Sequence, residues 1–186
     1  MFWKKSSKSS PHNESQHSST KSLSHSNHNT NSRKDGLYTP DKILLQKVQF
    51  DVYFLGVIED VNMGNSRKRD TEAQLVDHVE EAQIEGKLPI TVTDDSKVTM
   101  FISRHGLKIM DMGKQEVIQR HPLHTVAQVI QYEDGSGKAN IVVKIGQLQI
   151  QRGSFQCYVY QCQSDEQAYE ICQYIRKLFD AISNKP

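Results

Sequence analysis

The sequence has 186 residues, of which 36% are hydrophobic and 24% are charged, and its formal net charge is +1. This length suits one domain of ordinary size plus a tail. A net charge near zero gives no overall field that would attract nucleic acid or a membrane, so we expect no nucleic-acid partner. The three cysteines, an odd number without framework spacing, argue against a secreted disulfide scaffold.

The first forty residues differ in composition from the rest of the chain. Ser, His, Asn and Lys dominate up to Gly36, and the main apolar side chains there are Phe2, Trp3 and Leu23. Such a segment cannot bury enough apolar surface to offset the entropy of ordering it. We therefore expect a disordered regulatory tail over residues 1–40, followed by a folded domain over residues 41–186. A plain solvated tail is the alternative to a regulated one.

The cellular setting is predicted from what the sequence lacks. It has no apolar run long enough to span a bilayer, and its first residues lack the apolar region of a signal peptide. We expect a soluble, cytoplasmic protein with reduced thiols. The basic residues of the tail add only a weak signal for nuclear entry.

The folded part is predicted to begin with a strand and a helix. Residues 48–60, VQFDVYFLGVIED, alternate in polarity and are rich in β-branched and aromatic side chains. A basic loop follows, and Thr71 and Gln74 have the spacing of a helix capping box. Gly86 and Pro89 favour a helix end. One apolar helix face is expected from Leu75, Val79 and Ala82.

Six further strands and a long final helix are predicted next. The strands are 98–103, 107–111, 116–120, 125–132, 139–145 and 155–162, all with period two. Ser164 and Gln167 have capping-box spacing at the start of a helix of about 19 residues, roughly 28 Å long. Its apolar stripe consists of Ala168, Ile171, Cys172, Ile175, Leu178, Phe179 and Ile182.

This order of elements predicts an α+β fold. Seven antiparallel strands bend into a sandwich or a partly open barrel, and an amphipathic helix can plug the gap. Three segments resemble a phosphotyrosine-binding (PTB) domain: FLG, PLHTVAQVIQYEDG and CYVYQCQSDEQAYEICQYIRKLFDAI. The resemblance implies a PTB/pleckstrin-like, seven-stranded antiparallel β-sandwich, a partly open barrel. It is capped by a C-terminal helix and carries a helix after the first strand.

A narrower resemblance covers about residues 50–186. The segments EGKLP, YEDGSGKA, VYQCQSDEQAYEICQ and NKP are similar to the integrin cytoplasmic-domain-associated protein family, also called integrin β-subunit-binding protein. This resemblance implies a non-enzymatic adaptor that binds the Asn-Pro-x-Tyr (NPxY) motif of an integrin β-subunit cytoplasmic tail. It would restrain integrin activation and cell adhesion by competing with activators such as talin and kindlin.

The resemblance also implies where the peptide binds. Domains of this type add the peptide as a strand to an exposed sheet edge, here residues 125–132, which contain no Lys, Arg or Pro to blunt pairing. The implied peptide residues of this segment are Leu123, Thr125, Val126, Ala127, Gln128, Val129 and Ile130. The last helix would supply the other wall through Ile175, Phe179 and Ile182. The alternative for these apolar side chains is an ordinary core role. Val126 and Ala127 are smaller than the family pattern, which alters the expected pocket.

Two charged clusters carry further expectations from the resemblance. Asp77, Glu80 and Glu81 would meet basic residues of a second partner, the Krev-interaction-trapped scaffold of the cerebral cavernous malformation complex. The alternative is a solvated helix face. The loop residues Arg67, Lys68 and Arg69 are candidates for phosphate or inositol-lipid contact, or for a solvated loop.

No motif indicates catalysis, a metal or a cofactor. The eight histidines and three cysteines show no ligand quartet of the usual spacing, and no phosphate loop or nucleophile elbow is present. Three functions therefore stay open, in decreasing order of support: the integrin-tail adaptor, a phosphoinositide-binding pleckstrin-like module, and an enzyme on a borrowed fold. We expect a monomer that reaches the plasma membrane and adhesions peripherally, through its partners.

Overall fold

The computed structural model describes residues 40–59, 72–146 and 155–183. All of them belong to one unit, Leu37–Pro186. Its strands are β1 Lys47–Ile58, β2 Lys97–Ser103, β3 Gly106–Asp111, β4 Glu116–Pro122, β5 Val126–Glu133, β6 Ala139–Gly146 and β7 Phe155–Gln161. Its helices are α1 Pro40–Leu45, α2 Glu72–Ile84 and α3 Asp165–Ser183, with short 3₁₀ turns at Asp94–Ser96 and Leu123–Thr125.

The predicted element order is confirmed. The seven strands form one antiparallel sheet in the order β4-β3-β2-β1-β7-β6-β5, with α2 after the first strand and α3 at the end. The sequence prediction missed α1, a six-residue helix whose Ile43 and Leu44 are buried beside α3. Among the described residues, no helix combines the length and apolar character needed to cross a membrane.

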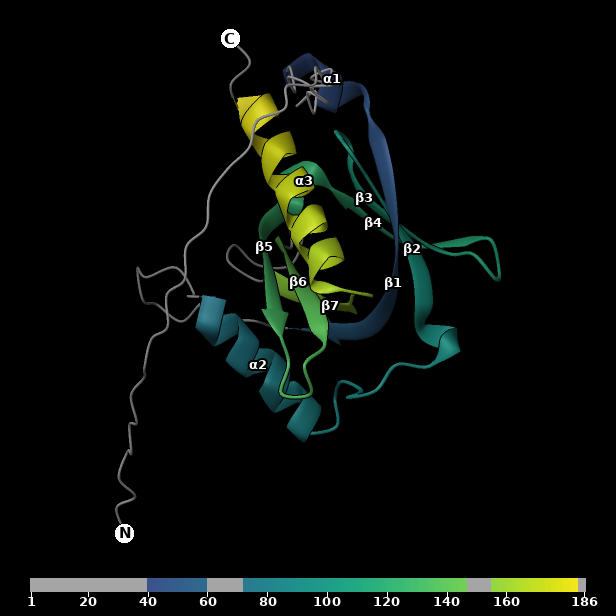
Figure 1. Cartoon of the computed structure of the whole chain (residues 1–186), viewed down its shortest axis with the longest axis vertical. Coiled ribbons are helices and arrows are strands. Elements are labelled where there is room, and N and C mark those ends of the chain that lie inside the picture. Colours follow the sequence, from purple (N-terminus) through teal and green to yellow (C-terminus); the bar gives the residue numbers. More distant parts are fainter. Residues whose placement is uncertain (1–39, 60–71, 147–154, 184–186) are drawn as a thin grey trace, which may run out of the picture. The chain divides into compact units, whose positions relative to one another are not determined.

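Strand β1 bends the sheet. Its residues 47–53 pair with β2, and its residues 53–58 pair with β7, so one strand serves both halves (Figure 1). A bulge between Phe54 and Gly56 marks the bend. Phe54 packs toward the core below α3, while the bulged Leu55 turns to the core below α2. The FLG segment therefore directs two adjacent apolar side chains to opposite faces.

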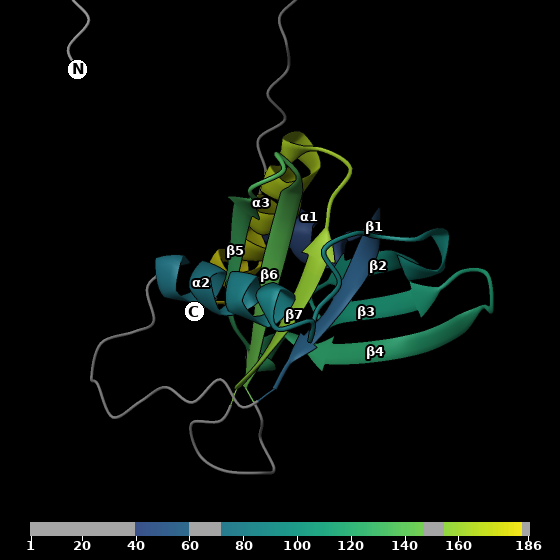
Figure 2. The same cartoon turned by 90° about the horizontal axis from the view of Figure 1, so that it is seen from below.

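The two longer helices cover opposite faces of the β5-β6-β7 half (Figures 1 and 2). The main core, beneath α3, includes Ile141, Val143 and Ile145 of β6. The second core, beneath α2, includes Val142 of β6. Because helices cover both faces, every β6 residue from Ala139 to Ile145 is buried, including the polar Asn140 and Lys144.

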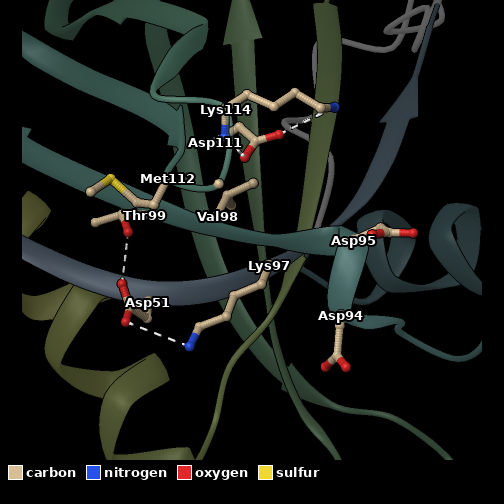
Figure 3. A pocket seen from close by; sticks show the side chains of 10 residues that line it. Asp51, Asp94, Asp95, Lys97, Val98, Thr99, Asp111, Met112 and Lys114 are labelled. Atoms are coloured by element: carbon tan, nitrogen blue, oxygen red, sulfur yellow. Dashed lines mark hydrogen bonds and ion pairs between the residues drawn. The ribbon is translucent and has the colours of Figure 1, made fainter.

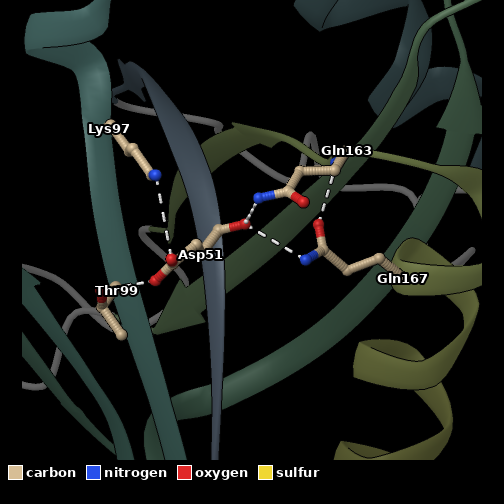
Figure 4. Close-up of polar contacts among 5 residues, drawn as sticks. All are labelled: Asp51, Lys97, Thr99, Gln163 and Gln167. Carbon is tan, nitrogen blue, oxygen red and sulfur yellow. Dashed lines mark hydrogen bonds and ion pairs between the residues drawn. The ribbon is translucent and has the colours of Figure 1, made fainter.

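Capping and side-chain amides fix where α3 begins. The Ser164 hydroxyl accepts a hydrogen bond from the Gln167 backbone N–H at 3.2 Å, as the capping-box spacing predicted. The side-chain oxygen of Gln167, however, accepts a hydrogen bond from the backbone N–H of Gln163. A capping box would use the backbone N–H of Ser164, one residue later. Both glutamine amides then donate to the Asp51 carbonyl, at 3.2 and 3.1 Å (Figure 4). These bonds tie the start of α3 to the middle of β1.

Helix α2 ends at Ile84, close to Gly86, as the sequence predicted. Gly86 has φ of +73°, and the Lys87 N–H donates to the Ala82 carbonyl at 2.8 Å while the Gly86 N–H donates to the Gln83 carbonyl at 3.1 Å. This is the Schellman pattern. It directs the chain back so that Leu88 is buried in the second core. The predicted cap at Thr71 lies outside the described residues.

The bulge glycine provides a test of the bend. Gly56 has φ of +141°, and a Cβ there would lie 2.6 Å from the Leu88 Cδ2 atom. We expect Gly56→Ala to lower the free energy of unfolding by about 2 kcal/mol, measured by urea titration. Gly86→Ala, also at positive φ but with nothing within 4 Å, should cost only about 1 kcal/mol. Equal losses in the two variants would show that crowding at the bulge contributes nothing.

Candidate functional site

The candidate site is the free edge of β5. Among the described residues, β5 pairs only with β6, so it forms one edge of the sheet, and β4 forms the other. Strand β4 carries Glu116, Arg120 and Pro122, residue types that discourage further pairing. Residues 126–132 of β5 carry neither charge nor proline. The two edges therefore differ in chemistry, and β5 is the one suited to accept another strand.

A tight turn leads into β5. The Thr125 hydroxyl donates to the Pro122 carbonyl at 2.7 Å, which closes the 3₁₀ turn Leu123–Thr125. The register with β6 then shifts between Val126 and Gln128, so Ala127 is the bulged residue. Because of this extra residue, Val126 and Val129 share one face of the strand although their spacing is odd.

The predicted strand residues fall into different environments. Leu123 and Val126 are buried in the main core at 5% exposure each, and Val129 is half-buried against that core. Ile130 belongs instead to the second core on the opposite face. The other three differ in exposure: Thr125 buried, Gln128 half-buried and Ala127 exposed.

The predicted helix residues run from the core to the surface. Ile175 is 2% exposed and lies inside the main core, together with Leu123 and Val126. Phe179 is half-buried against the same core, and Ile182 is 44% exposed. Helix α3 packs against β5 and β6. We use the name β5–α3 border for this packed region, in which Val129 of β5 and Phe179 of α3 are both half-buried against the main core.

The predicted acidic residues lie on the outer face of α2. Asp77, Glu80 and Glu81 are all exposed, and the opposite face of the helix packs in the second core. Glu81 also lies 3.9 Å from the His78 ring. Burial, followed by the charges of Asp134 and Glu80, raises the pKa of the Tyr132 hydroxyl on β5. The Tyr132 ring packs against the second core, beneath the same helix.

Sequence reasoning missed a polar pair that supports the turn before β5. The Gln119 side-chain oxygen accepts a hydrogen bond from the Tyr160 hydroxyl at 2.7 Å and lies 3.4 Å from His121 Nε2. The His121 ring packs on the Tyr158 ring, with centroids 4.3 Å apart. These contacts join β4 to β7 across the bent sheet. The sequence signal that could have revealed these contacts is the alternation of β4, which places the polar Gln119 and His121 on its inward face.

The remaining polar candidates are placed as follows. Arg67, Lys68 and Arg69 lie outside the described residues, so the structure does not bear on phosphate binding there.

A hollow of about 650 Å³ lies at the β3–β4 turn, lined by residues such as Asp51, Asp94 and Lys114 (Figure 3). Its lining includes no residue of β5 or α3, so it is separate from the candidate edge.

The three cysteines lie in the interior of the domain. All three are free and buried. Burial raises the pKa of Cys162 to about 12 and that of Cys172 to about 11, so both thiols are protonated at neutral pH. Within the ranges that the structure describes, no group of three or more His, Cys, Asp or Glu side chains is placed to hold a metal ion.

The architecture defines the class of this domain. An open seven-stranded antiparallel sheet, a helix after its first strand and a C-terminal helix over its inner face are the features expected of a PTB/pleckstrin-like fold. The family model described as beta-1 integrin binding protein matches residues 2–186. The chain therefore belongs to this family, which confirms the resemblance found in the sequence.

Individual relatives agree with the family. The chain is similar to integrin beta-1-binding protein 1 of Bos taurus, with 27% identity over 140 residues, covering 74% of this chain and 70% of that protein. For the Mus musculus protein of the same name, identity is 25% over 134 residues, covering 72% and 66%. A solved MyTH4-FERM MF2 domain of Dictyostelium discoideum myosin VII, mutant 1, matches with 13% identity and a TM-score of 0.33. That match spans 60% of this chain and 22% of the other, and it is too weak to indicate more.

The buried histidine makes stability depend on pH. Burial lowers the pKa of His121 from 6.5 to about 4. The unfolded chain then binds more protons than the folded one between these values, so stability falls as pH drops through this window. We expect the wild type to lose up to about 3 kcal/mol more than His121→Gln between pH 7 and pH 4. Chemical denaturation at several pH values measures this, and parallel curves for the two proteins would contradict it.

Proposed function

We propose that this chain is a non-enzymatic adaptor that binds the NPxY-type motif of an integrin β-subunit cytoplasmic tail. The tail segment before the motif would add as an antiparallel strand to β5, and its apolar side chains would lie on the β5–α3 border. Membership of the beta-1 integrin binding protein family supports integrin as the partner. The names of the bovine and mouse relatives state the same partner for those proteins.

The observation that carries the proposal is the unpaired edge of β5 beside a partly exposed apolar border. Among the described residues, this edge of β5 has no partner strand, and residues 126–132 carry no charge, so β5 suits strand addition. Val129 and Phe179 are half-buried, so a bound side chain could finish their burial without rearranging the core. The backbone ladder would supply affinity, and the border would supply selectivity.

The wider role follows from occupying the tail. An adaptor on the integrin motif would compete with activators such as talin and kindlin, and so restrain integrin activation and adhesion. We place the protein in the cytoplasm, recruited to the plasma membrane and adhesions through its partner, with entry into the nucleus as a further expectation. The acidic face of Asp77, Glu80 and Glu81 would receive a basic segment of the Krev-interaction-trapped scaffold.

Hydrogen exchange tests the mode of binding directly. An NPxY peptide should protect alternate amides of β5, because every second N–H of an edge strand points away from its partner β6. Amide exchange of the full chain, with and without the peptide, measures this by NMR spectroscopy. A scrambled peptide of the same composition should leave the amides unchanged. Peptide binding that protects amides of β4 instead of β5 would place the site on the opposite edge of the sheet and contradict the proposal.

Phe179 separates a binding role from a core role. Phe179→Ala should weaken peptide binding about tenfold while lowering the melting temperature only slightly, because the ring is already partly exposed. Fluorescence anisotropy with labelled peptide and calorimetry on the same preparation measure both effects. Tyr169→Ala, at a 54% exposed position of α3 outside the border, is the matched control and should change neither. Equal losses of affinity and stability in Phe179→Ala would assign the ring to the core alone.

A further inference from the structure

The half of the sheet formed by β1, β2, β3 and β4 has a second face, turned away from the main core. On β1 and β2 the core side is occupied by Val52 and Met100, so their neighbours in sequence point the other way. We call this surface the outer face. Its residues, none of which belongs to either core, are Lys47, Gln49, Asp51, Lys97, Thr99, Phe101, Ser103, Lys108, Met110 and Arg120.

One end of the outer face is a hollow of about 470 Å³ that we call the basic end. Its charged lining consists of Lys47, Lys108 and Arg120, and the described residues contribute no carboxylate to it. The Nζ atoms of Lys47 and Lys108 lie 4.4 and 4.6 Å from the centre of the Phe101 ring. Desolvation, followed by the charges of Lys47 and Arg120, lowers the pKa of Lys108. The three cations therefore crowd one another without a neutralising group.

The other end is the hollow of about 650 Å³ at the β3–β4 turn, which we call the acidic end (Figure 3). Its lining has four carboxylates and only two lysines. Both lysines already lie beside a carboxylate, at 3.9 and 3.4 Å, in the pairs Lys97–Asp51 and Lys114–Asp111. Asp94 and Asp95 precede β2 and take part in no ion pair among the described residues. These two carboxylates give this end a surplus of negative charge.

The two ends lie along the same strands. Lys47 and Asp51 are four residues apart on one face of β1, which corresponds to about 13 Å. Lys108 and Asp111 follow in the same order on β3, because β1 and β3 are both antiparallel to β2. The charge on the outer face therefore changes from positive to negative in one direction across the sheet.

A face with opposite charges at its two ends is complementary to itself. A two-fold axis that lies in the interface and crosses the strands would place the basic end of one copy on the acidic end of the other, and the reverse. A partner of a single charge sign would be attracted by one end and repelled by the other. Pairing also covers Phe101 and Met110, which are half-buried in one copy. We propose that two copies of this chain pair through their outer faces.

The size of the outer face indicates a weak, reversible dimer. Four strands about 4.8 Å apart and six residues at about 3.3 Å each cover roughly 400 Å² per copy. This is about half of the 800 Å² or so that each partner buries in a standard interface. The sequence led us to expect a monomer, and the proposal differs from that expectation.

Pairing through the outer face leaves the β5–α3 border free, because β5 lies at the far end of the sheet from β4. A dimer would then present two borders. If the proposed adaptor function holds, on which this consequence rests, one dimer could engage two integrin tails and gain avidity.

Analytical ultracentrifugation of the full chain at about 0.1–1 mM, in about 0.05 M salt, tests the pairing. The wild type should form a dimer whose share rises with concentration. Lys47→Glu/Lys108→Glu makes both ends acidic, and Asp94→Lys/Asp95→Lys makes both ends basic. Each variant alone should dimerise at least about tenfold more weakly, because like charges then meet. An equimolar mixture of the two variants should dimerise about as well as the wild type, since each altered end meets an end of opposite sign.

The control Glu80→Lys/Glu81→Lys reverses two exposed charges on α2, away from the outer face, and should dimerise like the wild type. Melting temperatures confirm that all variants fold. A wild type that stays monomeric, a mixture that does not recover, or a control that weakens equally would each overturn the proposal. So would a polyglutamate peptide that binds the basic end of a monomeric wild type, because it would assign this surface to an acidic partner. NPxY-peptide affinity should be unchanged in both variants, so failure here is distinguishable from failure of the adaptor function.

Discussion

The structure depends on the apolar stripe of α3 filling the inner face of a sheet that does not close. Strands β4 and β5 form the two ends of the sheet, and no pairing joins them among the described residues. Without α3, the inner side chains of β5, β6 and β7 would face water. The buried residues of α3 are Ala168, Ile171, Cys172, Ile175, Leu178 and Ala181, so Ala181 takes the core place that the sequence had assigned to Ile182. Burying a large aliphatic side chain stabilises a fold by about 1.5–3 kcal/mol, so this helix contributes much of the marginal stability typical of a domain.

The position of that helix also determines the candidate site. The amides of Gln163 and Gln167 tie its first turn to Asp51 on β1. From this anchor α3 runs beside β5 (Figure 1). Its later turns carry the half-buried Phe179 and the exposed Ile182. The helix covers one face of β5, while the outer edge of the strand has no partner in the described part of the chain. A single packing element thus completes the core and creates the border at which we place the integrin tail.

Much of this arrangement could be predicted from the sequence, because periodicity reports burial. The two-residue period of hydrophobicity predicted seven strands, and the apolar stripe of the last helix predicted its observed length. The free edge of β5 was implied only by family resemblance, since no local pattern distinguishes an edge strand from an internal one.

Three features could not be predicted, for physical reasons. Helix α1 is too short for a periodic signal and depends on tertiary packing beside α3. The bulge at Ala127 inverts the alternation of β5, so coordinates were needed to tell which core Val129 faces and which core Ile130 faces. The outer-face hollow lined by Lys47, Phe101, Lys108 and Arg120 combines residues from four strands, and only the register brings them together.

The two faces of β5 place different requirements on the sequence of a strand that adds to it. Successive side chains of an added strand point to opposite faces of the sheet. One set would meet the apolar surface near Phe179, and the other would turn toward the α2 side, where Asp77, Glu80 and Glu81 are exposed. A segment that alternates apolar and basic residues would satisfy both sides, whereas one with acidic residues in the second set would be repelled. The two alternating sets of side chains on the added strand would then each contribute to selectivity, without a deep pocket.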